Sequence, residues 1–474
     1  MARSVAVFVC QKCGVIAPRW QGKCDGCHEW NTLQEEKPTV GPKHVLTASL
    51  FSRPRPNQRA ASYGPVVFEK LHGAHEPVPR LLSGLSEVDR VTGGGFVPGS
   101  VVLIGGDPGI GKSTLLLQVC ASLARTQKSI VYISGEEALP QIRLRAGRLS
   151  LADQPVALAT ETHVEAIIGS LQEDPPAFVV IDSIQTMWTN TLDQAPGTVS
   201  QLRGSTQALV SFAKSHNVTL ILVGHVTKDG QLAGPRVLEH MVDVVLSFEG
   251  DSARHFRILR TVKNRFGPTE EIGVFEMTSS GLSEVANPSA LFLAGRDLFA
   301  PGTAVFAGLE GSRTLLFEIQ ALVAPSGLAM PRRAVVGWDS NRLAMILAVL
   351  EKHGRMKWGT YDIYLNVAGG LKITEPAADL AVIAALLSSI SSVPVSPHTV
   401  YFGEVGLSGT VRPVGQVGAR LREAHKLGFA SAVIPDGPRS VSDGEEESMI
   451  LKKVSHVRDV IKTIRPAHRT DNRA

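Results

Sequence analysis

The segment Gly106-Asp-Pro-Gly-Ile-Gly-Lys-Ser113 decides the fold of this chain. It matches the phosphate-loop pattern GxxxxGK[ST] at every position, follows the apolar run Val101–Ile104 and leads into a helical pattern that begins at Thr114. Glycines let backbone N–H groups converge on phosphates, and the N-terminus of the following helix adds positive partial charge. A strand, a phosphate loop and a helix in this order predict a nucleotide-binding α/β domain.

The pattern also predicts a role for each residue of a site for ATP and Mg²⁺. We expect the phosphates to be held by the whole loop, that is by Gly106, Asp107, Pro108, Gly109, Ile110, Gly111, Lys112, Ser113 and Thr114. Lys112 would neutralise the β- and γ-phosphates, and the Ser113 hydroxyl would hold Mg²⁺. A glycine-rich turn without a ligand is the alternative, and the surrounding strand and helix patterns argue against it.

Two further apolar runs end in carboxylates. Ala177–Asp182 reads as a strand whose terminal carboxylate would support Mg²⁺ through its waters. After the phosphate-loop helix, the run that ends at Ser134 is followed by Glu136 and Glu137. We expect this strand to lie beside the phosphate loop in a RecA-like sheet, so that Glu136 acts as the base. Glu137 is the close alternative, and a solvated acidic turn is the non-catalytic interpretation.

A histidine follows the apolar run Thr219–Gly224. This residue, His225, would stand at the carboxyl end of a strand, where ligand sites of α/β sheets form. We expect it to sense the γ-phosphate, although a lone histidine is more often structural.

The chain changes character along its length. From Leu81, short apolar runs alternate with helical patterns, which predicts a mostly parallel sheet with helices on both faces. The alternation ends near Val285, and the next block has its own strands and a buried helix at Asp379–Ser388. We expect five parts, namely a four-cysteine element (1–34), a basic Pro-rich linker (35–78), an ATPase domain (79–286), a further domain (287–465) and a basic tail (466–474).

Four of the five cysteines form two CxxC pairs, Cys10 with Cys13 and Cys24 with Cys27. Two such pairs at this distance place four thiolates around a tetrahedral Zn²⁺ ion, and a short polar segment needs the metal to fold. A redox CxxC is the alternative, but no βαβ pattern surrounds the pairs. Cys120 falls in a helical pattern and is expected in the core.

Composition and charge restrict the class of protein. Of 474 residues, 43% are hydrophobic and 19% charged, as in soluble proteins with sizeable cores. No secretory signal and no bilayer-length apolar run is visible, so we expect a cytoplasmic protein without membrane contact. The first 60 residues hold nine Lys or Arg against four acids, and Lys452–Ala474 is also basic. Basic ends suit a polyanionic partner, with solvation as the alternative.

Taken together, these residues resemble the bacterial RadA (Sms) family over essentially the whole length. The resemblance rests on the four-cysteine segment ending in Cys27-His-Glu-Trp-Asn, the phosphate loop, Ser134-Gly-Glu-Glu and the pentapeptide Lys263-Asn-Arg-Phe-Gly267. It implies an α/β fold in three parts. These are an N-terminal zinc-binding element, a RecA-like P-loop ATPase core and a C-terminal Lon-protease-like α+β domain.

The resemblance implies a DNA-stimulated ATP hydrolase of recombination and repair. It implies a homo-hexameric ring that threads single-stranded DNA, drives branch migration on branched DNA and works with a RecA-type recombinase. Lys263 and Arg265 would act at the ATP site of the neighbouring subunit or couple that site to DNA, as cations supplied in trans do. An ATP-switched DNA-binding scaffold without translocation is the alternative.

The Lon-like domain is not expected to be a protease. Ala377 stands where the nucleophilic serine belongs and Gly418 where the lysine base belongs, and no neighbour can activate an alanine. We expect the domain to serve ring assembly or DNA contact. Four cations could face phosphates or simply be solvated, namely Lys372, Arg412, Arg420 and Arg422.

Overall fold

The computed structural model describes residues 7–10, 16–17, 19–25, 29–36, 79–224, 237–250, 256–269, 271–327, 330–370, 372–437 and 449–464. The chain divides into two compact units, Met1–Glu284 and Val285–Ala474, and each is considered by itself. Most of the expected linker (37–78) and the expected tail lie outside the described residues. The finer division into five parts stays a prediction.

The N-terminal element is a three-stranded antiparallel sheet in the order β2-β1-β3. Its strands are β1 (Val7–Cys10), β2 (Ile16–Ala17) and β3 (Leu33–Glu36). Its core consists of Cys10, Ala17, Cys24 and Leu33, with Phe8 packed against them. So few apolar side chains cannot offset the conformational entropy of ordering the segment, so a further source of stability is required.

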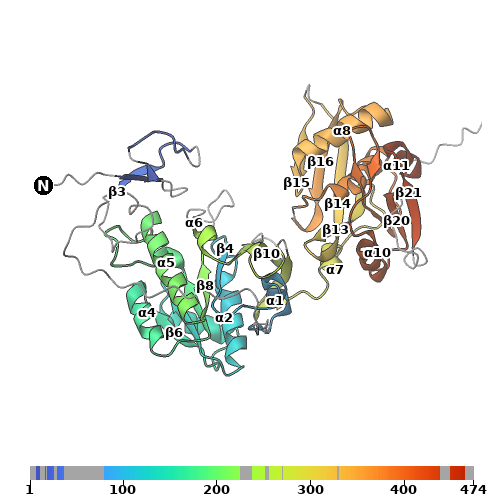
Figure 1. The fold of residues 1–474 in the computed structure, drawn as a ribbon. Helices are drawn as coiled ribbons and strands as arrows, with labels where there is room; N and C mark the ends of the chain where they lie inside the picture. Colours follow the sequence, from blue (N-terminus) through green and yellow to red (C-terminus); the bar gives the residue numbers. More distant parts are fainter. Residues whose placement is uncertain are drawn as a thin grey trace, which may run out of the picture. The chain divides into compact units, whose positions relative to one another are not determined.

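A nine-stranded sheet forms the centre of the first unit (Figure 1). Its strands are β4 (Val101–Gly106), β5 (Ile130–Ser134), β6 (Ala157–Thr160), β7 (Phe178–Asp182), β8 (Thr219–Val223), β9 (Val244–Glu249), β10 (Phe256–Asn264), β11 (Ile272–Thr278) and β12 (Gly281–Glu284). They are arranged in the order β12-β11-β10-β9-β4-β8-β7-β5-β6. All pairs from β9 to β6 are parallel, whereas β9 to β12 pair antiparallel. The predicted, mostly parallel sheet is confirmed.

Helices cover both faces of this sheet. They are α1 (Ser86–Thr92), α2 (Lys112–Ala124), α3 (Leu139–Arg148), α4 (Val164–Gln172), α5 (Val199–Ser215) and α6 (Val237–Met241). Side chains alternate along a strand, so β4 serves two cores. Val102 and Ile104 pack with α1, α2 and α3, whereas Val101 and Leu103 pack with α4, α5 and α6. Cys120 of α2 is fully buried in the first of these cores, as expected.

The strand after the phosphate-loop helix, β5, ends beside the phosphate loop as expected, since Ser134 and Glu136 line one cavity with Gly109 and Lys112. It does not pair with β4, however, because β8 and β7 lie between them. Parallel crossovers carry the chain outward from β4 to β5 and back, so strand order does not follow chain order. β5 instead pairs with β7, which places Ser134 opposite Asp182.

The second unit contains a seven-stranded mixed sheet in the order β15-β16-β14-β13-β17-β20-β21. Its strands are β13 (Thr303–Glu310), β14 (Arg313–Pro325), β15 (Arg333–Val336), β16 (Tyr361–Val367), β17 (Thr399–Tyr401), β20 (Ser431–Pro435) and β21 (Ile450–Val454), and a small pair is formed by β18 (Glu404–Val405) and β19 (Val411–Arg412). The helices are α7 (Pro288–Phe292), α8 (Ser340–Gly354), α9 (Asp379–Ser391), α10 (Val417–Lys426) and α11 (Val457–Ile464).

The predicted buried helix of this unit is confirmed. Every residue of α9 from Asp379 to Ser388 is buried, and the helix contacts β13 and β14. The predicted strand Thr399–Val405 is interrupted at Gly403, where a Cβ atom would stand 2.8 Å from Leu380 Cδ1. The Gly403 N–H donates to the Ala377 oxygen at 2.8 Å instead of to a neighbouring strand. Among the described residues, no helix is long and apolar enough to cross a membrane.

Candidate nucleotide site

A cavity of about 320 Å³ opens where the carboxyl ends of β4, β5 and β7 meet. Its lining includes most of the predicted site, namely Pro108, Gly109, Gly111, Lys112, Ser113, Thr114, Glu136 and Asp182, with the alternative base Glu137. Ser134, Arg145 and Arg148 also line it, whereas Gly106, Asp107 and Ile110 of the loop do not. Ligands of open α/β sheets bind at this edge. The structure therefore brings together residues from three separate stretches of sequence.

The phosphate loop is shaped by two glycines with left-handed backbone. Gly109 has φ +77° and Gly111 has φ +116°, conformations that side chains rarely adopt. A Cβ atom on Gly111 would also stand 2.9 Å from Met277 Cε. Lys112 is buried, and its Nζ donates to the backbone oxygens of Gly106 at 2.7 Å and Asp107 at 3.0 Å. Burial lowers the pKa of Lys112, and the nearby charge of Asp182 opposes that shift.

Asp182 lies directly against the start of α2. Its Oδ2 accepts a hydrogen bond from the Ser113 hydroxyl at 2.6 Å and another from the Tyr132 hydroxyl. Burial, and then the charge of Asp182, raise the pKa of Tyr132. A hydroxyl and a carboxylate held together beside a phosphate loop are oxygen ligands of the kind that Mg²⁺ prefers. The donor set fits a nucleotide-bound Mg²⁺ ion.

Glu136 and Glu137 differ in their contacts. Glu136 accepts a hydrogen bond from the Ser183 hydroxyl, and Ser183 follows Asp182 directly. Glu137 instead forms an ion pair with Arg145 of α3. The Ser183 bond holds Glu136 next to the end of β7, whereas the ion pair holds Glu137 against α3. The contacts therefore favour Glu136 over Glu137 as the residue that orients water.

Sequence reasoning missed four residues of this site. Arg145 and Arg148 line the cavity from α3, while Tyr132 and Ser183 hold the two carboxylates. The two arginines had a usable signal, because a spacing of three residues puts them on one face of a helix that starts just after Glu137. Tyr132 and Ser183 had none, since only the pairing of β5 with β7 brings them to the carboxylates.

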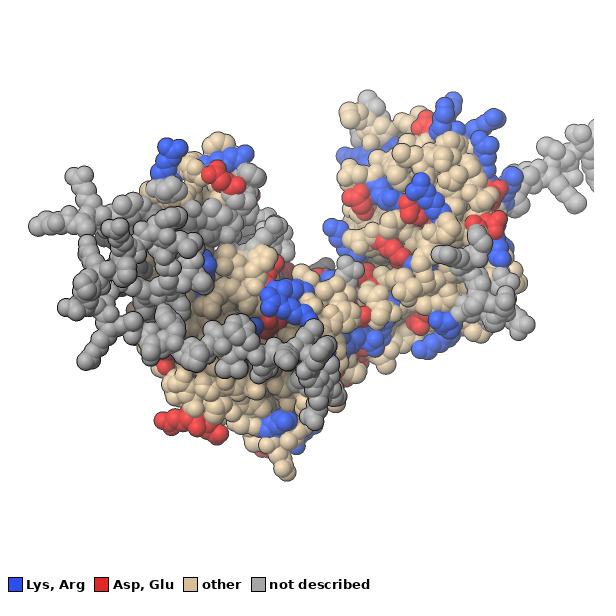
Figure 2. Space-filling model, in the orientation of Figure 1, with Lys and Arg blue, Asp and Glu red and all other residues tan. Residues whose placement is uncertain are grey.

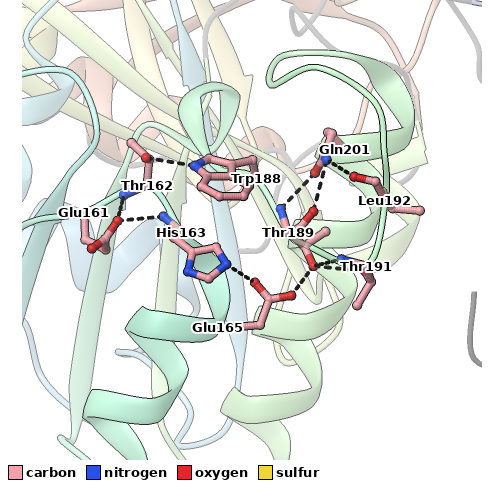
Figure 3. A network of polar contacts seen from close by, with 9 residues as sticks. All are labelled: Glu161, Thr162, His163, Glu165, Trp188, Thr189, Thr191, Leu192 and Gln201. Atoms are coloured by element: carbon pink, nitrogen blue, oxygen red, sulfur yellow. Dashed lines mark hydrogen bonds and ion pairs between the residues drawn. The ribbon is translucent and has the colours of Figure 1, made fainter.

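The segment after Asp182 is held by one buried glutamine (Figure 3). Gln201 of α5 accepts a hydrogen bond from the backbone N–H of Thr189 at 2.9 Å. Its amide nitrogen donates to the backbone oxygens of Thr189 (3.1 Å), Leu192 (2.9 Å) and Gln194 (2.9 Å). One side chain therefore fixes the path of the loop that begins at Ser183, the partner of Glu136.

A second set of contacts in Figure 3 ties the same loop to the start of α4. The Trp188 indole stacks on His163 with ring centroids 4.4 Å apart, and its Nε1 donates to Thr162 Oγ1 at 3.1 Å. Glu165 lies 3.1 Å from His163 Nε2 and accepts a hydrogen bond from the Thr189 hydroxyl. The loop is thus anchored on both sides, next to the candidate base.

Lys263 and Arg265 lie at the amino ends of the parallel strands, opposite the end that carries the phosphate loop. Asn264, between them, pairs with Val244, which in turn pairs with Val102 at the start of β4. The phosphate loop begins at Gly106, four residues further along β4 than Val102. At roughly 3.3 Å per residue, the loop is therefore about 13 Å from the level of Asn264 along the strand direction. Neither cation is therefore part of the cavity in its own chain.

Both cations have partners at that end of the strands. Lys263 Nζ donates to the backbone oxygens of Glu239 at 2.6 Å and Val242 at 2.8 Å, and burial lowers the pKa of Lys263. Arg265 shares the buried carboxylate of Asp243 with Lys214, at 3.3 and 3.1 Å. The Arg265 side chain is still 54% exposed, so it can meet a partner.

The predicted zinc ligands are described in part. Cys10 and Cys24, one from each CxxC pair, are buried together in the small core of the N-terminal element. Cys13 and Cys27 lie outside the described residues, as does His225. Within the described residues no group of three or more ligand side chains gathers. Two thiols brought together inside an element with hardly any core fit a structural Zn²⁺ ion.

The C-terminal unit joins the two segments that would carry a Lon-type dyad. Ala377 is buried in a short 3₁₀ turn (Pro376–Ala378), and Gly418 is the second residue of α10. Arg420 pairs with the Glu375 carboxylate and donates to the backbone oxygen of Ala307 at 2.6 Å. The expectation that Arg420 faces phosphates is wrong, because its side chain is 0% exposed and engaged.

The other three cations proposed for phosphate contact are exposed, namely Lys372, Arg412 and Arg422. Arg412 lies 3.7 Å from Glu404. Figure 2 shows Lys and Arg scattered over the visible face of this unit with Asp and Glu between them, rather than gathered in one stripe. Phosphate contact by these residues stays a prediction.

Three family models match the chain in order. A rubredoxin metal binding domain matches residues 8–35, an AAA domain matches residues 74–231, and subunit ChlI of Mg-chelatase matches residues 329–437. The fold is therefore a zinc ribbon, a RecA-like ATPase core and a ChlI- or Lon-like domain. Among solved structures, the match to one ATPase domain has a TM-score of 0.39 and 15% sequence identity. It covers 45% of this chain and 93% of the chain of that structure. The RadB recombinase (TM-score 0.36, 24% identity) covers 43% and 99%.

Curated relatives match almost end to end. A DNA repair protein RadA from Brucella abortus is 58% identical over 442 residues, 92% of this chain and 93% of the relative. The DNA repair protein RadA of Bacillus subtilis is 47% identical over 435 residues, 92% and 93% of the two chains. That of Rickettsia felis is 46% identical over 98% of this chain and 100% of the relative. Identity at this level over nearly the whole length shows that the chain belongs to the RadA family of DNA repair proteins.

Proposed function

We propose that this chain is a DNA-stimulated ATP hydrolase that moves single-stranded and branched DNA during homologous recombination, as branch migration requires. The observation that carries the proposal is the joining of Ser113, Asp182 and Glu136 around one cavity beside the phosphate loop. Family membership supplies the DNA repair context.

The predicted residues of the site have distinct parts in hydrolysis. Backbone N–H groups of the loop and Lys112 Nζ hold the phosphates, and Lys112 turns from its backbone partners to do so. Ser113 would hold Mg²⁺ and Asp182 would support it through its waters, and the bound ion would supply positive charge to the phosphates. Glu136 orients the attacking water, an effect typically worth on the order of 10²- to 10⁴-fold in rate. His225 is proposed as the γ-phosphate sensor.

The position of Lys263 and Arg265 supports assembly into a closed ring, which we propose is a homo-hexamer. These cations cannot complete the cavity of their own chain, because they lie at the opposite end of the parallel strands. A head-to-tail neighbour would present them to the next cavity, where a cation stabilises charge during phosphoryl transfer. Hydrolysis would then depend on assembly.

The remaining parts of the proposal concern partners and absent activities. We propose that the zinc element is structural and that the ring cooperates with a RecA-type recombinase. The Lon-like domain is proposed as an assembly or DNA-contact scaffold rather than a peptidase, since Ala377 carries no hydroxyl to act as a nucleophile.

The test is ATP hydrolysis with and without single-stranded DNA, for the unchanged protein and for Lys112→Ala. Stimulation by DNA that disappears in the variant supports a coupled motor. The next measurement is strand displacement on three- and four-way junctions, with ATP and with a non-hydrolysable analogue. DNA binding and ATP turnover without displacement would favour the alternative of an ATP-switched scaffold. Hydrolysis that ignores DNA would contradict both the motor and its coupling.

A further inference from the structure

The zinc element exposes two large aromatic side chains. Trp20 is 55% exposed and Trp30 is 69% exposed, whereas Trp338 and Trp358 of the other unit are 7% and 2% exposed. An element with a core of four small or medium side chains gains most by burying its indoles. Two exposed tryptophans in one small element therefore indicate a binding surface rather than a solvated one.

The two indoles lie next to each other. Residues 22–25 pair with residues 29–31 through hydrogen bonds from Asn31 N to Gly22 O (2.7 Å) and from Cys24 N to Glu29 O (2.9 Å). Trp30 belongs to the second of these segments, and Trp20 precedes the first. A Cβ atom on Gly22 would lie 3.4 Å from Trp30 Cζ3 and 3.9 Å from Trp20 Cη2. The rings flank this glycine, and the absence of a side chain there leaves the surface between them open.

Cations stand beside these rings. Lys23 forms an antiparallel bridge with Trp30, and its Nζ lies 6.0 Å from the centroid of the indole. Arg19 is exposed and precedes Trp20 directly. The carboxylate of Asp25 accepts a hydrogen bond from Gln21 at 2.8 Å. The described part of the element also holds four acids (Asp25, Glu29, Glu35 and Glu36), so the positive charge that could meet a phosphate is confined to Arg19 and Lys23 beside the rings.

We infer that Trp20 and Trp30 form a stacking platform for the bases of single-stranded DNA, with Arg19 and Lys23 placed for its phosphates. Unpaired bases expose flat faces that stack on aromatic rings whatever the sequence, while basic side chains follow the backbone. The choice of DNA rests on the proposed function, whereas the platform itself rests on the exposed rings. Its residues all belong to the zinc element, and none of them lines the ATP cavity.

The experiment compares two strands of equal length on the full-length, zinc-loaded protein. Labelled oligo(dT) has phosphates and bases, whereas the abasic strand has phosphates alone. Trp20→Ala and Trp30→Ala should weaken binding to oligo(dT) by about 5- to 100-fold and leave the abasic strand nearly unchanged. Trp→Phe at either position should restore most of the affinity. Phe299→Ala, which removes an exposed aromatic ring from the other unit, is the matched control and should have no effect.

A second measurement needs no variant. Oligo(dT) should quench the intrinsic tryptophan fluorescence of the unchanged protein, and the abasic strand should not. Equal losses on both strands, no loss on either strand, or no quenching would overturn the platform and leave the surface to a protein partner. The proposed function is tested separately by DNA-stimulated hydrolysis. If bases stack on the platform but DNA does not stimulate ATP hydrolysis, only the proposed motor is contradicted. If DNA stimulates hydrolysis but no stacking is measured, only the platform is contradicted.

Discussion

The Ser113 hydroxyl donates a hydrogen bond to the Asp182 carboxylate at 2.6 Å. The two residues are 69 positions apart in the chain, Ser113 in the first turn of α2 and Asp182 at the end of β7, and β8 lies between β7 and the strand β4 that precedes α2. This contact joins the phosphate loop to the end of β7. It makes a single oxygen-ligand site out of two motifs that the sequence shows separately.

Asp182→Asn should lower ATP hydrolysis on the order of 100-fold or more, because a neutral amide cannot balance the charge of Mg²⁺. The Mg²⁺ concentration needed for half-maximal activity should rise, and a Mg²⁺ titration of the hydrolysis rate checks this. Ser113→Thr is the control, since it keeps the hydroxyl and the phosphate-loop pattern. A variant with an unchanged Mg²⁺ response would rule out this role for Asp182.

Glu136→Gln and Glu137→Gln should separate the two acidic neighbours. The first should reduce the turnover rate by on the order of 10²- to 10⁴-fold and leave ATP binding intact, because the candidate base is lost. The second removes the partner of Arg145 and should cost much less. Single-turnover hydrolysis and nucleotide binding, measured on both variants, separate a loss of the chemical step from a loss of ATP binding. The opposite ranking would assign the base to Glu137.

Mixing two inactive variants tests the action of Arg265 in trans. Lys112→Ala lacks a working cavity, and Arg265→Ala lacks the cation that we propose reaches the neighbouring cavity. Each alone should be nearly inactive, whereas a mixture should regain hydrolysis, because some interfaces then pair an intact Lys112 with an intact Arg265. Lys214→Ala removes the other exposed partner of Asp243 and is the control for local disruption. A mixture no more active than its components contradicts the model.

Gln201→Leu should loosen the loop that follows Asp182. The change removes four hydrogen bonds, each worth about 1 kcal/mol net, and leaves buried backbone groups without partners. Amide hydrogen exchange in residues 183–198 should rise and ATP hydrolysis should fall as Ser183 loses its fixed position beside Glu136. Gln194→Ala is the matched control, since Gln201 contacts only the backbone of that residue. Unchanged exchange would mean that other contacts hold the loop.

Arg420→Ala should destabilise the C-terminal unit by about 3–5 kcal/mol, because it leaves Glu375 without its buried partner. Arg422→Ala, two residues further along the same helix, is exposed and should change stability by no more than about 0.5 kcal/mol. Thermal unfolding of the full chain is recorded for each variant, and the transition that belongs to the C-terminal unit gives the stability loss to be compared. Similar losses for both variants would show that Arg420 is not a structural anchor.

Local patterns in the sequence predicted the phosphate loop, the strands of the ATPase core and the buried helix at Asp379–Ser388. Each of these features is defined by residues close together in the chain, so a loop motif or a run of apolar residues is enough to predict it. Short-range patterns did not show that β7 and β8 lie between β4 and β5, and the expectation for Arg420 was wrong. Strand order depends on which crossovers the packed helices allow, and the burial of a cation depends on a partner far away in the chain.

The sequence by itself determined that this protein binds a nucleotide and that its four clustered cysteines suit zinc, because each signal is a set of neighbouring residues whose chemistry needs that spacing. Only the tertiary structure decided which acidic residue is paired with Arg145, which loop Gln201 holds and at which end of the parallel strands Lys263 and Arg265 lie. Those relationships join residues that are distant in the chain. They arise from the pairing of strands and the packing of helices, which no local pattern records.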